Sequence, residues 1–218
     1  SLGGGSFTEY TLNQYWGGYN AAGEYEDSVL VSLLHDREDL CAPCVGLVLN
    51  GDQHIIRVPF VLVEGAGSML PNIPINLSSE EQVSLVLEGY YNNIKIQKTT
   101  TFYGDSFIID QHVSVFGDLG GDVFLVWNKG LKNTESNLFD DVTYAGVSLS
   151  HKEKIETLSF SPSTISDKLD KEFFSGSIDW VAMRNKYFVM AMIPKEASFV
   201  GCGGISSNLN SENVVPIY

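Results

Sequence analysis

The sequence predicts a mainly β protein, an antiparallel β-sandwich with one to three short helices. Apolar and polar residues alternate with a period of two in most segments, and these segments are rich in β-branched and aromatic residues. Turn clusters such as "NGDQ" and "GDLGGD" separate them. The chain has 218 residues, 44% of them hydrophobic, so it is long enough to bury a core as a single domain over residues 1–218.

Eight segments have the composition and alternation of strands. They are residues 7–16, 54–64, 82–89, 91–104, 106–117, 121–130, 144–151 and 154–161. The stretch "VGLVLNG" after Cys44 reads as one more strand that runs into a turn. Pro59 lies inside the second segment and indicates a sheet edge or a bulge. The stretch "FYGDSF" predicts a tight hairpin, because Gly104 and Asp105 tolerate the positive φ of primed turns.

Three segments are candidate helices. Residues 34–40 could form a turn or two, and residues 161–174 carry apolar residues at fourfold spacing. The third is "GSIDWVAMRNKYFVMAMIP", residues 176–194, where Ser177 and Asp179 resemble an N-cap and a first-turn acid. One helical face would hold Trp180, Met183, Tyr187 and Ala191. The same letters from Phe188 to Ile193 could equally form a buried strand.

Charge and motif content exclude several classes of function. The 27 acidic and 13 basic residues give a formal charge of −14, which repels phosphate backbones, and no Lys/Arg cluster offsets it. We therefore expect no nucleic-acid partner. No apolar run approaches the roughly 20 residues that a membrane-spanning helix needs. No histidine spacing typical of a metal site occurs, and we expect neither a metal nor a cofactor.

Two weak constellations offer alternative functions. Cys41 and Cys44 form "CAPC", the spacing of thiol oxidoreductases, but a strand follows it where a redox site needs a helix. Two loop cysteines, free or joined locally, are the favoured interpretation, and Cys202 stands apart. A sugar-active enzyme or carbohydrate-binding domain would need a histidine with a carboxylate. The candidate pairing is His112 with Asp110 or Glu88.

The C-terminal half closely resembles the periplasmic domain of the bacterial YidC-type membrane-protein insertases. The stretch "WVAMRNKYFVMAMIP" carries the Trp, the Tyr-Phe pair and the Ile-Pro end of that family in the same order. The matching residues are Trp180, Met183, Lys186, Tyr187, Phe188, Ile193 and Pro194. The stretch "IKIQKTTTFYGDSFIIDQHVSVFG" is similar to the family's Lys-Thr-aromatic strand and hairpin. There the matching residues are Lys98, Thr99, Phe102, Asp105, Phe107 and Asp110. The resemblance covers residues 90–194 well and fades outside them.

The resemblance implies a β-supersandwich related to galactose mutarotases, with helices toward its C-terminal side. It implies a non-catalytic interaction and scaffold domain in the periplasm, attached to a membrane domain that performs insertion. Sec translocon accessory proteins and nascent membrane proteins would be its partners. Trp180, Met183, Tyr187 and Phe188 would anchor a short helix on the sandwich. Two features depart from the family: the "CAPC" insertion, and an end at "VVPIY" where further strands are expected.

Overall fold

The computed structural model describes residues 2–20, 22–35, 40–65, 75–137, 143–159, 170–196 and 198–206. The chain forms two compact units. The first comprises Ser1–Ser6 and Cys44–Phe124, and the second comprises Phe7–Pro43 and Leu125–Tyr218. The prediction of a single domain over residues 1–218 stays a prediction.

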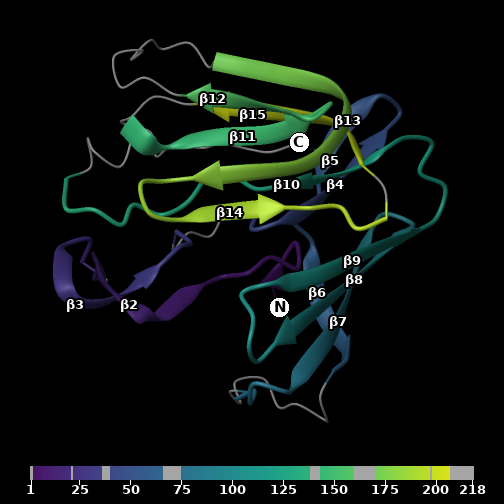
Figure 1. Ribbon diagram of the computed structural model, residues 1–218. Helices are drawn as coiled ribbons and strands as arrows, with labels where there is room; N and C mark the ends of the chain where they lie inside the picture. Colours follow the sequence, from purple (N-terminus) through teal and green to yellow (C-terminus); the bar gives the residue numbers. More distant parts are fainter. Residues whose placement is uncertain are drawn as a thin grey trace. The chain divides into compact units, whose positions relative to one another are not determined.

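The first unit is built on a five-stranded antiparallel sheet in the order β1-β6-β7-β8-β9 (Figure 1). Its strands are β1 (Leu2–Gly3), β6 (Pro59–Glu64), β7 (Gln82–Tyr91), β8 (Ile94–Tyr103) and β9 (Ile109–Phe116). A three-stranded sheet has the order β10-β4-β5, with β4 (Cys44–Leu49), β5 (Asp52–Ile55) and β10 (Val123–Val126). Strand β10 begins in this unit and ends in the other.

The alternation in β8 shows why the sheet of the first unit has two different faces. Ile94, Ile96, Lys98 and Thr100 are buried, whereas the residues between them are partly exposed. Strand β7 pairs with β8 over ten consecutive residues, so Val86 and Glu88 share the outer face with their partners. Gly46 of β4 lies close to the ring of Phe124. A Cβ at position 46 would lie 2.2 Å from that side chain, so only glycine fits there without a shift.

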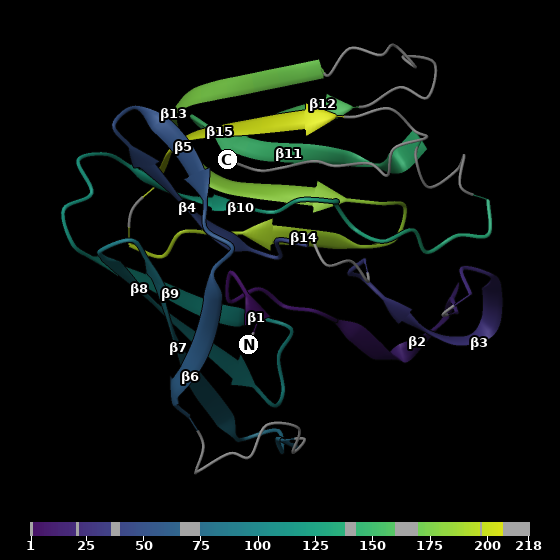
Figure 2. The same cartoon turned by 180° about the vertical axis from the view of Figure 1, so that it is seen from behind.

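The second unit holds another five-stranded sheet, which Figures 1 and 2 show from opposite sides. Its order is β12-β11-β13-β14, and β15 also pairs with β13. The strands are β11 (Gly146–His151), β12 (Lys154–Ser159), β13 (Asp170–Arg184), β14 (Val189–Met192) and β15 (Phe199–Ser206). Strands β2 (Thr11–Tyr19) and β3 (Tyr25–Ser32) form a separate hairpin.

One face of this sheet carries the core of the second unit. Val147, Leu149, Val181 and Met183 pack with residues from the segments around Leu34, Leu40 and Trp127. A smaller cluster joins Leu12, Val31 and Leu33 of the β2–β3 region, with Phe188 packed against it. Both clusters are apolar, so burial of hydrocarbon surface holds the sheet to its covering segments.

The prediction of a mainly β, antiparallel fold is confirmed. The helix expected within residues 176–194 is wrong, because these residues lie in β13, a turn and β14. Residues 170–174 of the helix expected at 161–174 belong to β13, and the remainder lies outside the described residues. Of the segment 34–40, only residues 34, 35 and 40 are described, and none is helical.

Two local expectations are corrected in detail. Residues 104–105 do form the turn between β8 and β9, but neither residue has a positive φ. Glycine is needed at 104 for another reason, since a Cβ there would lie 1.7 Å from the Ser78 carbonyl oxygen. Pro59 is the first residue of β6, a position that needs no ladder hydrogen bond from its nitrogen. Among the described residues, no helix is long and apolar enough to cross a membrane.

Candidate functional site

The turn between β13 and β14 contains the Tyr-Phe pair that the sequence singled out. Asn185 is buried and organises this turn. Its Oδ1 accepts hydrogen bonds from the backbone nitrogens of Tyr187 (3.1 Å) and Phe188 (2.8 Å). Its Nδ2 donates to the Lys132 carbonyl at 3.2 Å and to the Thr134 hydroxyl at 3.3 Å. One side chain thus shapes the turn and ties it to residues 132–134.

Electrostatic contacts reinforce the same attachment. The Lys186 Nζ lies 3.3 Å from the Glu135 Oε1, and its ammonium also lies 5.2 Å from the centre of the Tyr187 ring. Hydrogen bonding with Tyr187 and Lys186 lowers the pKa of Glu135, and hydrogen bonding with Tyr187 and Glu135 raises the pKa of Lys186. Because both side chains are partly solvated, we expect the ion pair to orient the turn more than to stabilise the unit.

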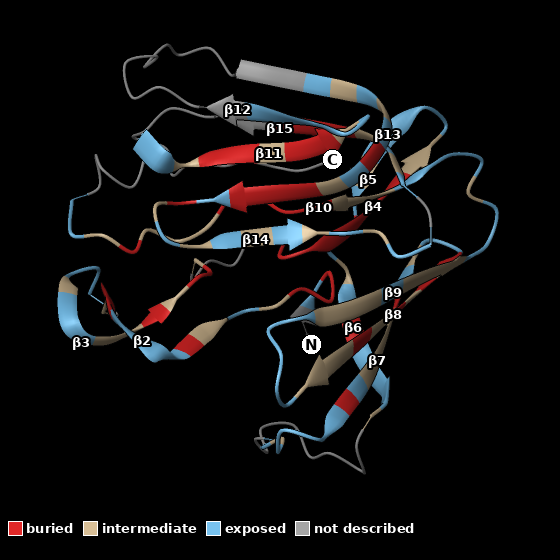
Figure 3. Ribbon diagram, in the orientation of Figure 1, coloured by how far each residue is buried: buried red, intermediate tan, exposed pale blue. Residues whose placement is uncertain are grey.

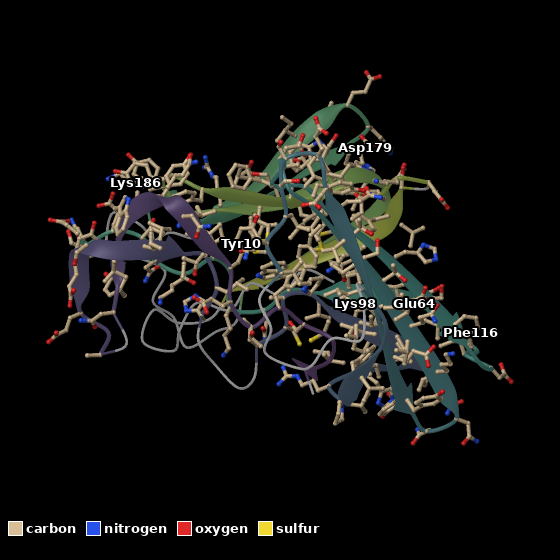
Figure 4. All side chains as sticks on the ribbon, turned by 90° about the horizontal axis from the view of Figure 1, so that it is seen from below. Tyr10, Glu64, Lys98, Phe116, Asp179 and Lys186 are labelled. Carbon is tan, nitrogen blue, oxygen red and sulfur yellow. The ribbon has the colours of Figure 1, made fainter. Side chains whose placement is uncertain are left out.

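The aromatic residues of the turn contact the β2–β3 hairpin. The ring of Phe188 packs edge-to-face on Tyr15, with 5.5 Å between the ring centres. Tyr19 donates a hydrogen bond to the Glu135 carbonyl at 2.6 Å. Figure 4 shows Lys186 close to the ribbon of this hairpin. The Tyr-Phe pair therefore joins three parts of the second unit, and it does so from a turn and not from a helix.

The remaining candidates of this stretch have different environments. Met183 is buried in the core, as an anchor should be. Trp180 is only half-buried, because it lies on the opposite face of β13 beside Ser150. Pro194 follows β14 and is also half-buried. Asp179 accepts a hydrogen bond from the Ser150 hydroxyl at 2.9 Å, so the residue expected to begin a helix instead braces two strands.

The face of the sheet that points away from the core is rich in exposed apolar side chains. Ile155 and Trp180 flank Ser150 on neighbouring strands, which places them on one face. The alternation continues through β14 to Ile193. Val200 of β15 is exposed next to Phe199, which packs on the core, so it points to the other side of the sheet, away from the core. We call this the apolar sheet face, and its members are Ile155, Phe173, Trp180, Val189, Ile193 and Val200. All except Trp180 are between 67% and 83% exposed.

The centre of the apolar sheet face holds two small side chains, and the exposed carboxylate of Asp179 bonds to one of them, Ser150. Ser150 and Ala182 lie next to Trp180 and are themselves buried beneath their larger neighbours. The exposed side chains belong to β12, β13, β14 and β15, and to Ile193 just after β14. Figure 3 shows pale blue stretches on β12 and β14 and a mostly red β11. Such a surface can take up another apolar surface without rearrangement of the sheet.

In the first unit, the sequence candidates do not converge on one site. Lys98 is fully buried on the inner face of β8, and its Nζ donates to the Gly5 carbonyl at 2.8 Å. Burial lowers the pKa of Lys98 to about 7. Phe102 is half-buried on the same strand, and Asp105 is exposed in the turn that follows. Asp110 accepts a hydrogen bond from the Tyr103 hydroxyl at 2.6 Å on the other face.

The acid–base pairing required for sugar chemistry is not assembled. His112 and Asp110 do share a face of β9, as predicted, but His112 is exposed there. Glu88 is held elsewhere, 2.6 Å from the Lys95 Nζ and 2.9 Å from the Gln97 Nε2. No group of three metal-ligating side chains occurs in the part of the chain that the structure describes.

The cysteines likewise form no reactive thiol site. Cys41 and Cys44 are both disulfide-bonded, one of the two states expected, but Cys44 is the first residue of β4 and not a loop residue. Cys202 is a free thiol in the core of the second unit, and burial raises its pKa to about 12. A thiol with this pKa stays protonated at neutral pH and is a poor nucleophile.

Several residues that shape the site were not found from the sequence. The role of Glu135 depends on Lys186, which lies 51 residues away, so no local pattern indicates it. Asn185 had a weak local signal, because asparagine favours turns, but the helical interpretation of the stretch hid it. The exposed side chains Phe173, Val189 and Val200 read as ordinary strand or helix residues until the pairing of β13, β14 and β15 is known.

Comparisons with known proteins agree with this geometry. The family model described as YidC periplasmic domain matches residues 1–202. An insertase named Membrane protein insertase YidC from Chloroherpeton thalassium is 32% identical over 156 residues, which cover 69% of this chain and 24% of that protein. The protein of the same name from Chlorobaculum parvum is 38% identical over 110 residues, or 46% of this chain and 17% of that protein. No solved structure matches.

The chain therefore spans about a quarter or less of the length of these relatives. The matched part includes the β13–β14 turn and the candidates on β8 and β9, since the family model extends over both units. The chain belongs to the YidC periplasmic domain family.

Proposed function

We propose that this chain is a non-catalytic interaction module that helps a membrane-protein insertase handle its clients. The apolar sheet face would receive apolar segments of nascent membrane proteins. The single observation that carries this proposal is the presence of five strongly exposed apolar side chains around Trp180 on one sheet face. The names of the relatives, Membrane protein insertase YidC, supply the class of client.

The energy available at this face is adequate for a transient contact. Full burial of an aliphatic or aromatic side chain contributes about 1.5–3 kcal/mol, and the five exposed side chains are already partly covered. Association and ordering of the client offset much of that gain. We therefore propose a weak and reversible contact, which suits a client that must leave for the bilayer. Sec accessory proteins are a further proposed class of partner, on the basis of the family resemblance.

The test uses the full-length insertase with nascent membrane proteins that carry a photo-cross-linker. We compare the parent with Val189→Glu/Ile193→Glu, which places two charges on the apolar sheet face. A matched control, Val61→Glu/Val63→Glu, puts the same charges on exposed positions of β6 in the first unit. The proposal expects lost cross-linking for the first variant and parental yield for the control. Parental yield for both variants would overturn it.

A further inference from the structure

Strand β9 ends the sheet of the first unit with one edge unoccupied by any described strand. It pairs with β8 over eight consecutive positions, from Lys95–Phe116 to Phe102–Ile109, without a bulge. At the other end of the same sheet, the short strand β1 covers β6. Lys98 fastens the chain just after β1, through the Gly5 carbonyl. At one edge of the sheet the chain itself therefore covers the first two residues of β6, whereas no described strand pairs with the outer edge of β9.

The backbone of β9 is available for hydrogen bonding along that edge. Among the described residues, the segment from Gln111 to Phe116 makes backbone hydrogen bonds only within its ladder with β8. Alternate N–H and C=O groups of an edge strand point away from the sheet. Natural sheets protect such edges with Lys, Pro or a bulge. The sequence "IDQHVSVF" of β9 contains neither residue, and its register is regular.

A side chain of β9 also lacks an acceptor. The Nε2 atom of Gln111 is buried and has no hydrogen-bond partner. Gln111 lies opposite Thr100 on β8, so its other neighbour position along the sheet is the open side. A strand added there would bring a side chain to within about 5 Å of the Gln111 Cβ. A side-chain oxygen at that place would satisfy the amide.

The surroundings of β9 restrict the chemistry of what can bind. Phe107 and Ile108, just before the strand, are 75% and 65% exposed, and Phe116 at its end is 50% exposed. Apolar residues near both ends of the added strand would cover them. A second copy of this chain is disfavoured by repulsion, because each copy has a formal charge of −14.

We infer that the open edge of β9 binds an extended segment of a different polypeptide by strand addition. The segment is neutral or basic, has an apolar residue near each end, and carries a side-chain oxygen opposite Gln111. Backbone pairing supplies the contact, so many sequences of this pattern fit. This site lies on the first unit and does not depend on the apolar sheet face of the second unit.

The first test uses a fluorescein-labelled peptide, Lys-Val-Thr-Val-Thr-Val-Thr-Val-Lys, and the 218-residue chain. The matched control peptides have the same side chains but N-methyl groups on alternate residues, in either of the two phases. By fluorescence anisotropy we expect saturable binding of the parent peptide. One of the two N-methyl phases should weaken it by about tenfold or more. Equal affinity for all three peptides would overturn strand addition.

The second test changes β9 itself with Val113→Pro and Ser114→Pro. Adjacent residues of an antiparallel strand point their N–H groups alternately toward and away from the partner. One variant therefore breaks a bond to β8, and the other removes an outward donor. We expect the variant with parental thermal stability to lose the peptide. Normal binding by that variant would overturn the inference, as would loss of the peptide by Ile193→Glu, which lies on the apolar sheet face.

Hydrogen exchange on the parent chain, with and without the peptide, tests the inference without any variant. The bound peptide should slow exchange at alternate amides between Gln111 and Phe116 and leave β12 and β14 unchanged. Protection elsewhere and not in β9 would contradict the assignment. Self-association of the free chain that shields the same amides would instead identify a second copy as the occupant, which contradicts the choice of a different polypeptide.

Discussion

The buried ammonium of Lys98 gives the sharpest prediction, because its effect on stability must change with pH. The side chain is fully buried, and desolvation lowers its pKa from 10.5 to about 7. Its Nζ donates to the Gly5 carbonyl, which holds the chain next to β1. We consider Lys98→Met, which keeps an unbranched side chain of similar length and removes the charge and the donor.

The sign follows from proton binding. Between about pH 7 and pH 10 the unfolded lysine binds a proton that the folded one does not, so stability rises with pH in this window. At pH 6 both forms are protonated, and the folded state must bury the full charge. From pH 6 to pH 9 the parent should gain about 3 kcal/mol relative to Lys98→Met. Loss of the bond to Gly5 shifts the curve of the variant by a constant and leaves this difference unchanged.

The assay is urea unfolding of both proteins at pH 6, 7, 8 and 9. We expect Lys98→Met to be the more stable protein at pH 6 and to lose that advantage by pH 9. If the two curves of unfolding free energy against pH run parallel across the range, the idea that burial lowers the pKa of Lys98 is refuted.

Substitutions at three further positions test the packing within each unit. Asn185→Ala should cost about 2–3 kcal/mol in urea unfolding, because four hydrogen bonds are lost. Asn185→Asp should keep the two bonds from the turn and cost less. Equal losses of stability would contradict the role of the residue 185 side-chain oxygen as an acceptor. Gly46→Ala should cost about 1–3 kcal/mol through its clash with Phe124, and an unchanged melting temperature would rule that clash out. Gly176→Ala should cost a similar amount, since φ is +127° and the new Cβ would lie 2.7 Å from His151; a neutral result would mean that β13 can relax at its bend.

The alternation in the sequence predicted the strands of the first unit well. In "IKIQKTTTFY" it places Ile94, Ile96 and Lys98 on one face, and the structure buries that face. What the pattern could not supply was the partner of Lys98, because Gly5 lies 93 residues earlier in the chain. The acceptor of this buried lysine is therefore found only in the folded chain.

The stretch from Ser177 to Pro194 shows the opposite case. Trp180, Met183 and Tyr187 have helical spacing, yet Val181 and Met183 also alternate with Trp180 and Ala182 as a strand requires. Both periods fit a short apolar run, and pairing with β11 decides between them. The apparent cap, Asp179, bonds with Ser150 on that neighbouring strand, a contact with no trace in the local sequence.

The candidate site likewise contains residues that the sequence identified and a surface that it did not. The resemblance identified Met183, Tyr187 and Phe188, and the structure gives each a definite place in the core or the β13–β14 turn. The apolar sheet face escaped detection because its members come from four strands, and only the pairing of these strands shows which side chains share a face. Surfaces of this kind depend on strand order, which local patterns do not encode.

The most direct measurement of the proposed function places a photo-cross-linking benzoylphenylalanine at Ile193 of the full-length insertase. A matched probe at Asp52, an exposed residue of β5 in the first unit, serves as the control. If the apolar sheet face receives clients, illumination during insertion should join the nascent membrane segment to position 193 and not to position 52. Equal yields at both positions, or no adduct at position 193, would contradict the proposed function.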